Sequence, residues 1–207
     1  GKFGGGGYKI AGGLHGVGAS VVNALSEWVE LDDTYEGHRF TVRFERGKKV
    51  REFVEVPIEE GREHGVRVTF KPDPEIFEET VFEYDILAER MREQAFLNAG
   101  IRILLTDDRG EERREELFYF EGGIKSFVTY MREKGNAEAI HENVIYMKSE
   151  KGSSIAEIAL QYNTKSTDEI LSFANNMHTI EGGMHETGFK AGLTKAINDY
   201  ARKWGIL

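Results

Sequence analysis

The chain has no cysteine and only 3 prolines in 207 residues. The absence of cysteine excludes disulfides, cysteine nucleophiles and thiolate metal sites, and it is typical of a reducing compartment. No run of about 18 apolar residues occurs, so the sequence predicts no membrane-spanning helix. We therefore expect a cytoplasmic protein with no membrane association.

Acidic side chains outnumber basic ones. The sequence has 27 Lys and Arg against 36 Asp and Glu, which gives a formal net charge of −9. This balance argues against a broad surface for DNA phosphates, although local basic patches remain compatible with it. A hydrophobic content of 40% and a charged content of 30% are typical of a globular chain. The length allows one large domain or two small ones.

Glycine, in contrast, is abundant and unevenly placed. Of the 24 glycines, nine fall in the first 18 residues. Residues 4–7 are all glycine and suit a mobile loop. Residues 12–20 lead into a predicted helix, because Val17, Val21, Val22 and Leu25 recur at helical spacing and the pattern ends near Glu27.

The second glycine run has the composition of an anion site. Glycines allow backbone N–H groups to surround a phosphate, and the start of a helix adds free donors and a positive dipole end. The run is not a P-loop, because no Gly-Lys-Ser/Thr follows it, and Val21 replaces the third glycine of a dinucleotide fingerprint. A flexible terminal linker followed by a tight turn is the open alternative.

The remaining pattern predicts an α+β fold in two units that divide around residue 120. Strands forming an antiparallel meander are predicted at 28–32, 40–44 and 50–56, with Gly37 and Gly47 as turn residues, and another strand is predicted at 66–70. A helix is predicted at 84–97, followed by a hairpin of 101–105 and 115–120. Later elements are a helix at 124–131, strands at 141–147 and 155–162, and a candidate strand at 169–177. A long final helix follows, and its exposed side carries Lys190, Lys195, Arg202 and Lys203.

Several motifs together resemble the B subunits of bacterial type II DNA topoisomerases, that is, the B subunits of DNA gyrase and of topoisomerase IV. The resemblance begins with Lys2-Phe3, Tyr8-Lys9 and the 12–26 stretch, which is highly specific. It continues in order to the end of the chain through Phe70-Lys71-Pro72-Asp73, Phe96-Leu97-Asn98, Glu121-Gly122-Gly123-Ile124-Lys125, Ala159-Leu160-Gln161-Tyr162-Asn163 and Asn198-Asp199-Tyr200-Ala201-Arg202-Lys203.

The resemblance implies an ATP-dependent type II topoisomerase. Residues 1–120 would be the C-terminal portion of a GHKL ATPase α/β sandwich, and 121–207 would belong to a transducer domain of the ribosomal protein S5 domain 2-like fold. The implied cofactors are ATP and Mg²⁺. The implied partners are a second B subunit, which dimerises on ATP binding, the topoisomerase A subunit in an A2B2 complex, and DNA bound by the whole complex. The residues implied to surround the triphosphate are Lys2, Tyr8, Lys9, Gly13, Leu14, His15, Gly16, Val17 and Gly18.

Some parts of the family pattern are not found. The resemblance places the general-base Glu, an Asn for Mg²⁺ and the adenine-reading Asp before these residues, and it places the transducer Gln and Lys after them. We therefore expect no catalytic or metal-ligating residue here and no ATP hydrolysis by these 207 residues alone. Three positions depart from the pattern: Thr41 stands for Arg, Val66 for Thr, and Met184 for Thr.

Other candidate sites have simpler interpretations. His185-Glu186 lacks the second histidine of a zinc helix, because position 189 is Phe, so a glycine turn and helix start are expected there. Asp32-Asp33, Asp107-Asp108 and Glu115-Glu116 are interpreted as solvated turns at strand ends. The alternatives for function are a catalytically silent dimerisation or binding module and another GHKL ATPase of the mismatch-repair type. Gyrase and topoisomerase IV are not separated by these motifs.

Overall fold

The computed structural model describes residues 17–58 and 64–207. The chain forms two compact units, one ending at Phe82 and the other spanning Glu83–Leu207. Helices and strands occur in both units, which confirms the α+β class. These units are defined by compactness alone, so the domain boundary near residue 120 stays a prediction. None of the described helices is long and apolar enough to cross a membrane.

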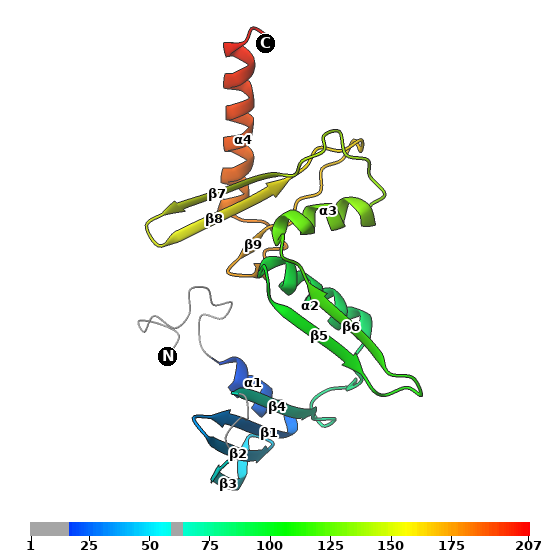
Figure 1. Cartoon of the computed structure of the whole chain (residues 1–207), viewed down its shortest axis with the longest axis vertical. Helices are drawn as coiled ribbons and strands as arrows, with labels where there is room; N and C mark the ends of the chain where they lie inside the picture. Colours follow the sequence, from blue (N-terminus) through cyan, green and yellow to red (C-terminus); the bar gives the residue numbers. More distant parts are fainter. Residues whose placement is uncertain (1–16, 59–63) are drawn as a thin grey trace. The chain divides into compact units, whose positions relative to one another are not determined.

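The first unit is built on a four-stranded antiparallel sheet (Figure 1). Its strands are β1 (Ser26–Tyr35), β2 (His38–Glu45), β3 (Lys48–Pro57) and β4 (Gly65–Pro72). All four predicted strands are present, and the sheet order β3-β2-β1-β4 confirms the meander predicted for the first three strands and places β4 beside β1. Because β4 pairs with β1, the first strand has hydrogen-bonded neighbours on both sides and contributes the buried Val29.

Both hairpin turns of this sheet use two residues in the left-handed region. Glu36 and Gly37 have φ of 47° and 79°, and Arg46 and Gly47 have φ of 45° and 77°. Two-residue turns of this hand match the twist of the flanking strands. The turns predicted at Gly37 and Gly47 are confirmed, whereas Arg46 adopts a backbone conformation that its own side chain disfavours.

Helix α1 (Gly18–Ala24) precedes the sheet and is shorter than predicted. The hydroxyl of Ser26 donates a hydrogen bond of 2.6 Å to the carbonyl of Val22, and Ser26 is already the first residue of β1. Serine side chains compete for helical carbonyls in this way. The helix therefore ends at Ala24 instead of near Glu27.

Asp73 joins the ends of several elements in the first unit. Its side chain is 2% exposed and accepts a hydrogen bond of 2.7 Å from Nε of Arg46. Its backbone N–H donates to the carbonyl of Leu25, just after α1, and that of Arg46 donates to the carbonyl of Glu27 in β1. A carboxylate oxygen of Asp73 also accepts the backbone N–H of Glu75. A buried carboxylate needs such compensation, so Arg46 is held in its left-handed turn.

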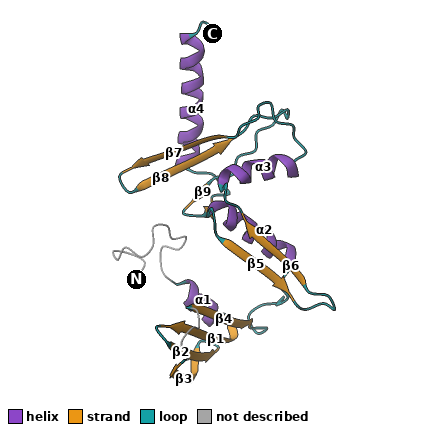
Figure 2. Cartoon of the chain, viewed as in Figure 1, coloured by secondary structure: helices purple, strands orange, loops and turns teal. Residues whose placement is uncertain are grey.

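The second unit has its core between one helix and a hairpin (Figure 2). Helix α2 (Tyr84–Leu97) matches its predicted range at both ends, and it packs on β5 (Arg102–Asp107) and β6 (Arg114–Tyr119). Phe96 is 1% exposed. Its ring lies 3.8 Å from that of Phe120 and 4.7 Å from that of Phe127, between centroids, which joins α3 (Ile124–Lys134) to the same core.

The rest of the second unit consists of two hairpins and a long helix. Strands β7 (Ile145–Lys151) and β8 (Ser154–Leu160) pair antiparallel, and α4 spans Met184–Lys203. The candidate strand at 169–177 is wrong, because two short strands, β9 (Phe173–Ala174) and β10 (Met177–His178), pair there as a hairpin. Asn175 and Asn176, with φ of 50° and 65°, form the turn that interrupts it.

Asp73 leads to a prediction about pH. The hydrogen bonds from Arg46 and from the backbone N–H of Glu75 hold the pKa of Asp73 below its ordinary value. A depressed folded-state pKa stabilises the fold above the unfolded pKa, and this stabilisation is lost as the pH falls through the folded pKa. Asp73→Asn should therefore lower the free energy of unfolding at about pH 7 and reduce its fall below about pH 4.

Urea denaturation across this pH range measures the effect. Asp108→Asn is the matched control, because Asp108 has a side chain that is 72% exposed. A loss of equal size at every pH for Asp73→Asn would show that the charge of Asp73 does not carry the stabilisation.

The aromatic core gives a second prediction. Phe96→Ala removes a fully buried ring and its stacking partners, so it should lower the free energy of unfolding by about 3–5 kcal/mol. Ile86→Ala, on the same helix but 59% exposed, should change it by no more than about 0.5 kcal/mol. Denaturation followed by circular dichroism measures the free energy of unfolding of both variants. Equal losses in Phe96→Ala and Ile86→Ala would show that Phe96 is not part of the stabilising core.

Candidate functional site

The predicted phosphate site lies mostly outside the described residues. This applies to Lys2, Tyr8, Lys9, Gly13, Leu14, His15 and Gly16. Val17 and Gly18 are described, and they form the start of α1, where the N–H of Val21 donates to the carbonyl of Val17 at 2.8 Å. The predicted helix start is therefore confirmed, while the roles of all nine residues stay predictions.

The start of α1 is open to solvent. Residues 17–20 are exposed, and a Cβ added at Gly18 would meet no atom of the described chain within 4 Å. Among the residues that the structure describes, no side chain caps this end of the helix. The N–H groups of a first helical turn have no partner within the helix. An anionic group can therefore approach these donors closely.

The other side of α1 faces an apolar hollow of about 270 Å³. Val21, Val22 and Leu25 line it from the helix, and Phe70 and Pro72 line it from β4. Three of the four apolar side chains with helical spacing thus line this hollow, whereas the fourth, Val17, is 51% exposed. Residues 17–20 are exposed, and the contact of Val17 and Gly18 with a nucleotide stays a prediction.

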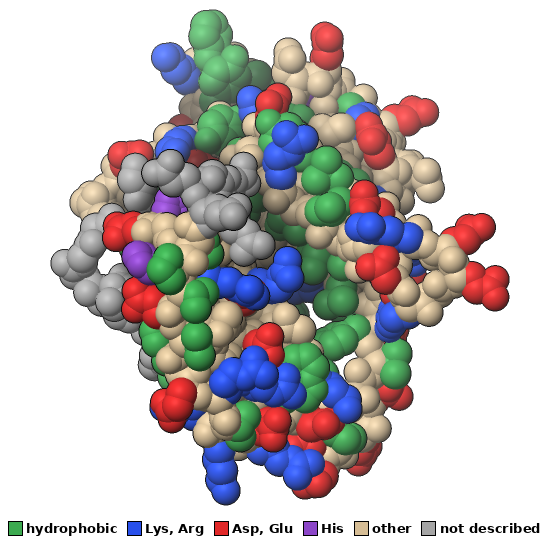
Figure 3. All heavy atoms as spheres, turned by 60° about the horizontal axis from the view of Figure 1, so that its bottom comes forward, with side chains coloured by type: hydrophobic (Ala, Val, Ile, Leu, Met, Phe, Trp, Pro, Cys, Tyr) green, Lys and Arg blue, Asp and Glu red, His purple; other side chains and the backbone are tan. Residues whose placement is uncertain are grey.

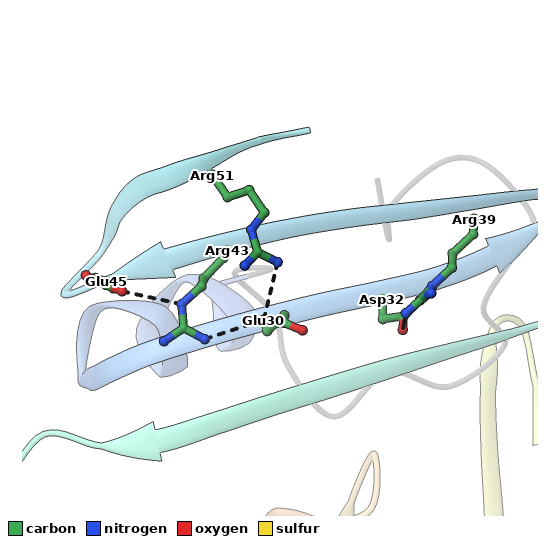
Figure 4. Close-up of polar contacts among 6 residues, drawn as sticks. All are labelled: Glu30, Asp32, Arg39, Arg43, Glu45 and Arg51. Carbon is green, nitrogen blue, oxygen red and sulfur yellow. Dashed lines mark hydrogen bonds and ion pairs between the residues drawn. The ribbon is translucent and has the colours of Figure 1, made fainter. Parts of the chain in front are cut away.

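A charged network covers part of the sheet on β1, β2 and β3 (Figure 4). Nη1 of Arg43 lies 3.4 Å from Glu30, its Nε lies 3.3 Å from Glu45, and Arg51 reaches Glu30 at 3.8 Å. The Arg43 guanidinium also stacks 4.6 Å from the ring centroid of Trp28. Exposed pairs of this kind contribute only about 0–1 kcal/mol each. The network orders the sheet surface and presents no unpaired acid for catalysis.

The prediction of a solvated turn at Asp32-Asp33 is wrong. Both residues lie within β1, and Arg39 binds the Asp32 carboxylate through two hydrogen bonds of 2.8 and 2.6 Å. Aspartate is usually disfavoured in strands, and the paired guanidinium of Arg39 allows Asp32 to occupy this one. Thr41, one of the three departures from the family pattern, lies opposite Asp32 in the register of β1 and β2.

The other two departures lie at exposed positions. Val66 is in β4, opposite Asp33, and is 68% exposed. Met184 is the first residue of α4 and is 86% exposed. Neither side chain is needed by the described packing, so their effect on a nucleotide site stays a prediction.

The glycines before α4 form a turn and a helix start, as predicted. Gly182 has a φ of 75°, and α4 begins two residues later. Nε2 of His185 lies 3.2 Å from the hydroxyl of Thr179. Within residues 17–58 and 64–207, no group of three His, Asp or Glu side chains is arranged to hold a metal ion.

Glu186 is the best-connected side chain in this turn. Its carboxylate accepts hydrogen bonds from Lys190 at 2.7 Å and from the Ser172 hydroxyl at 2.9 Å. The hydrogen bond from Lys190, which has the larger effect, and the one from Ser172 hold the pKa of Glu186 below its ordinary value. Glu186 in turn raises the pKa of Lys190. Both side chains therefore stay charged near neutral pH.

One face of α4 carries a row of exposed polar side chains. Lys190, Lys195, Arg202 and Lys203 are all exposed, as predicted. The surface of this face is formed by Thr187, Lys190, Ala191, Thr194, Lys195, Asn198, Asp199 and Arg202. The sequence pattern alone does not single out the threonines and Asn198, although Thr194 and Asn198 share a four-residue spacing with Lys190 and Arg202. Lys, Arg, Thr and Asn side chains are the usual donors to phosphate oxygens.

Positive charge is not gathered into a broad surface elsewhere in the view of Figure 3. That face shows Lys and Arg side chains interspersed with Asp, Glu and apolar ones. We define the α4 row as Lys190, Thr194, Asn198 and Arg202, and we take it as the candidate for contact with a phosphate backbone.

Comparison with known proteins gives consistent results. A family model for DNA gyrase B matches residues 123–207. The DNA gyrase B subunit of Clostridium acetobutylicum is 53% identical over 208 residues, which cover 100% of this chain and 32% of that protein. The DNA topoisomerase 4 B subunit of Enterococcus faecalis is 49% identical over 100% of this chain and 30% of its own length. The chain thus spans about a third of the length of the curated relatives it matches.

Solved structures agree with the sequence relatives. The 43K ATPase domain of Thermus thermophilus gyrase B, crystallised with an aminocoumarin, has a TM-score of 0.81 and 36% identity, covering 93% of this chain and 52% of that one. The gyrase B protein of Myxococcus xanthus has a TM-score of 0.77 and 28% identity over 86% of this chain and 51% of that one. This chain belongs to the family of DNA gyrase and topoisomerase IV B subunits.

Proposed function

We propose that this chain forms the nucleotide-lid and transducer part of a type II topoisomerase B subunit, which uses ATP to pass one DNA duplex through another. The observation that carries the proposal is the match, over all of this chain, to gyrase and topoisomerase IV B subunits. The similarity to a gyrase B ATPase domain over 93% of this chain supports the nucleotide-binding role.

The proposed domain boundary follows the predicted one. Residues 1–120 would complete a GHKL ATPase domain, and 121–207 would begin the transducer. The family model that matches 123–207 supports a boundary close to Glu121. In this arrangement α2 and the β5–β6 hairpin belong to the ATPase domain, although they pack in the same compact unit as α3.

The residues present fit a triphosphate group at the start of α1. The helix end is exposed, its first-turn N–H groups lack helical partners, and Gly18 has no Cβ to block an oxygen atom. Lys2 and Lys9 would add positive charge, and Mg²⁺ would enter with ATP. When bound, the nucleotide supplies the phosphoanhydride bond, and these residues bind and orient its phosphates.

The proposed partners are a second B subunit on ATP binding, the topoisomerase A subunit and DNA, all in the cytoplasm. The α4 row would contact the DNA backbone. The net charge of −9 makes such a local row more suitable than a general basic surface.

A substitution at Gly18 tests the nucleotide site. Gly18→Ala should weaken binding of a non-hydrolysable ATP analogue by at least about tenfold, because the added methyl group would occupy the space needed by a phosphate oxygen. The fold should remain, since the new Cβ meets no described atom within 4 Å. Isothermal titration calorimetry in the presence of Mg²⁺ measures the affinity of the full-length protein.

Gly192→Ala is the matched control, because Gly192 is also an open helical position, in α4. It should leave nucleotide affinity unchanged. If the unchanged full-length protein binds no nucleotide, the silent binding module becomes the better interpretation.

The α4 row gives a separate prediction. Lys190→Ala and Arg202→Ala should each weaken DNA binding by the complete enzyme and reduce its dependence on salt by roughly one phosphate contact. Lys151→Ala removes an exposed charge of the same sign from β7 and serves as the control. Binding isotherms over a range of salt concentrations measure the slopes, and equal slopes for all three variants would exclude the row as a DNA contact.

A further inference from the structure

The short hairpin of residues 172–179 links two helices that lie far apart in the sequence. It contains β9, the Asn175-Asn176 turn and β10. Its tip contacts α2, and its base contacts the start of α4. Its two ends therefore connect the helix that precedes the β5–β6 hairpin with the helix that carries the α4 row.

At the tip, three amide side chains make three linked hydrogen bonds, one between two side chains and two to backbone carbonyls. Nδ2 of Asn176 donates to Oδ1 of Asn98 at 2.8 Å, and Nε2 of Gln94 donates to the carbonyl of Asn176 at 3.2 Å. Nδ2 of Asn98 donates to the carbonyl of Gln94 at 2.8 Å, which sets the orientation of the Asn98 amide. All three side chains are half-buried, so these hydrogen bonds are shielded from competing water.

At the base, the contacts to α4 are made by hydroxyl side chains. The buried Ser172 donates to the Glu186 carboxylate at 2.9 Å, and the Thr179 hydroxyl lies 3.2 Å from Nε2 of His185. The N–H of Thr179 donates to the carbonyl of Ser172 at 2.8 Å and closes the hairpin. Both contacts reach the first turn of α4, and a hydrogen bond to a charged carboxylate is among the stronger kinds.

The sides of the hairpin are also held in place. The Phe173 and His178 rings, on facing strands, lie 5.1 Å apart between centroids. The Phe173 ring also lies 6.2 Å from that of Phe127 in α3. Tip, sides and base are thus each fixed by a separate contact, so the hairpin can move only if several of them break together.

We propose that the 172–179 hairpin is a strut that positions α4 relative to α2, with Asn176 as its positioning residue. The inference rests on the proposed function, in which α2 belongs to the ATP-binding domain and α4 contacts DNA. A chain of hydrogen bonds then joins the two: α2 to Asn176, through the hairpin to Ser172, and from there to Glu186. Its role is to keep nucleotide turnover coupled to strand passage.

The test uses the complete enzyme, with the full-length protein carrying Asn176→Gly. Glycine adopts the left-handed turn without cost, so this change removes the amide and leaves the backbone unstrained. The KM for ATP and the DNA-independent ATPase rate should stay within about twofold. The number of strand-passage events per ATP hydrolysed should fall by roughly 5- to 10-fold.

Asn175→Gly is the matched control, because Asn175 is the neighbouring left-handed residue, with an exposed side chain. It should couple ATP hydrolysis to strand passage as the unchanged enzyme does. Asn98→Ala should reproduce the Asn176→Gly defect, and the double variant should lose little more than either single one, since both remove the same hydrogen bond.

Three outcomes would overturn the inference: unchanged coupling in Asn176→Gly, equal loss in Asn175→Gly, or additive loss in the double variant. If Asn176→Gly lowers thermal stability and the ATPase rate and raises the KM for ATP together, the residue has a structural role only, which would also overturn the inference. If the unchanged enzyme shows no ATP-dependent strand passage at all, the proposed function itself fails, which is a distinguishable result.

Discussion

The ion pair between Asp73 and Arg46 is the constraint on which the first unit depends. One buried carboxylate meets a guanidinium from the β2–β3 turn, while the backbone of Asp73 binds the end of α1. The pair thus ties a helix, a hairpin and the end of β4 to one point. Removing Arg46 would leave the buried carboxylate with only the backbone N–H of Glu75 among these donors, which is why Arg46 is kept in a left-handed backbone conformation.

Other charges in this unit have a different function. The Arg43 network and the Asp32–Arg39 pair lie on exposed or half-buried strands, where each pair adds little stability. They allow acidic side chains to occupy strand positions without repulsion. The second unit depends instead on stacked aromatic rings around Phe96, and polar contacts become important only where its elements meet at the 172–179 hairpin.

The two proposed functional surfaces lie on different units and use different physics. At α1, an exposed helix start and a glycine without a Cβ offer backbone donors to phosphate. At α4, long side chains spaced along one face offer charge and hydrogen bonds to a polymer.

The sequence by itself determined what depends on neighbouring residues: α2 at both ends, the glycine turns at Gly37 and Gly47, and the exposed side of α4. These follow from periodicity and turn chemistry, which act over a few residues. Only the tertiary structure decided the pairing of β4 with β1, the burial of Asp73 and the contact of Asn176 with Asn98. Such contacts join residues distant in sequence, and local patterns carry no information about which partner a strand, a carboxylate or an amide will meet.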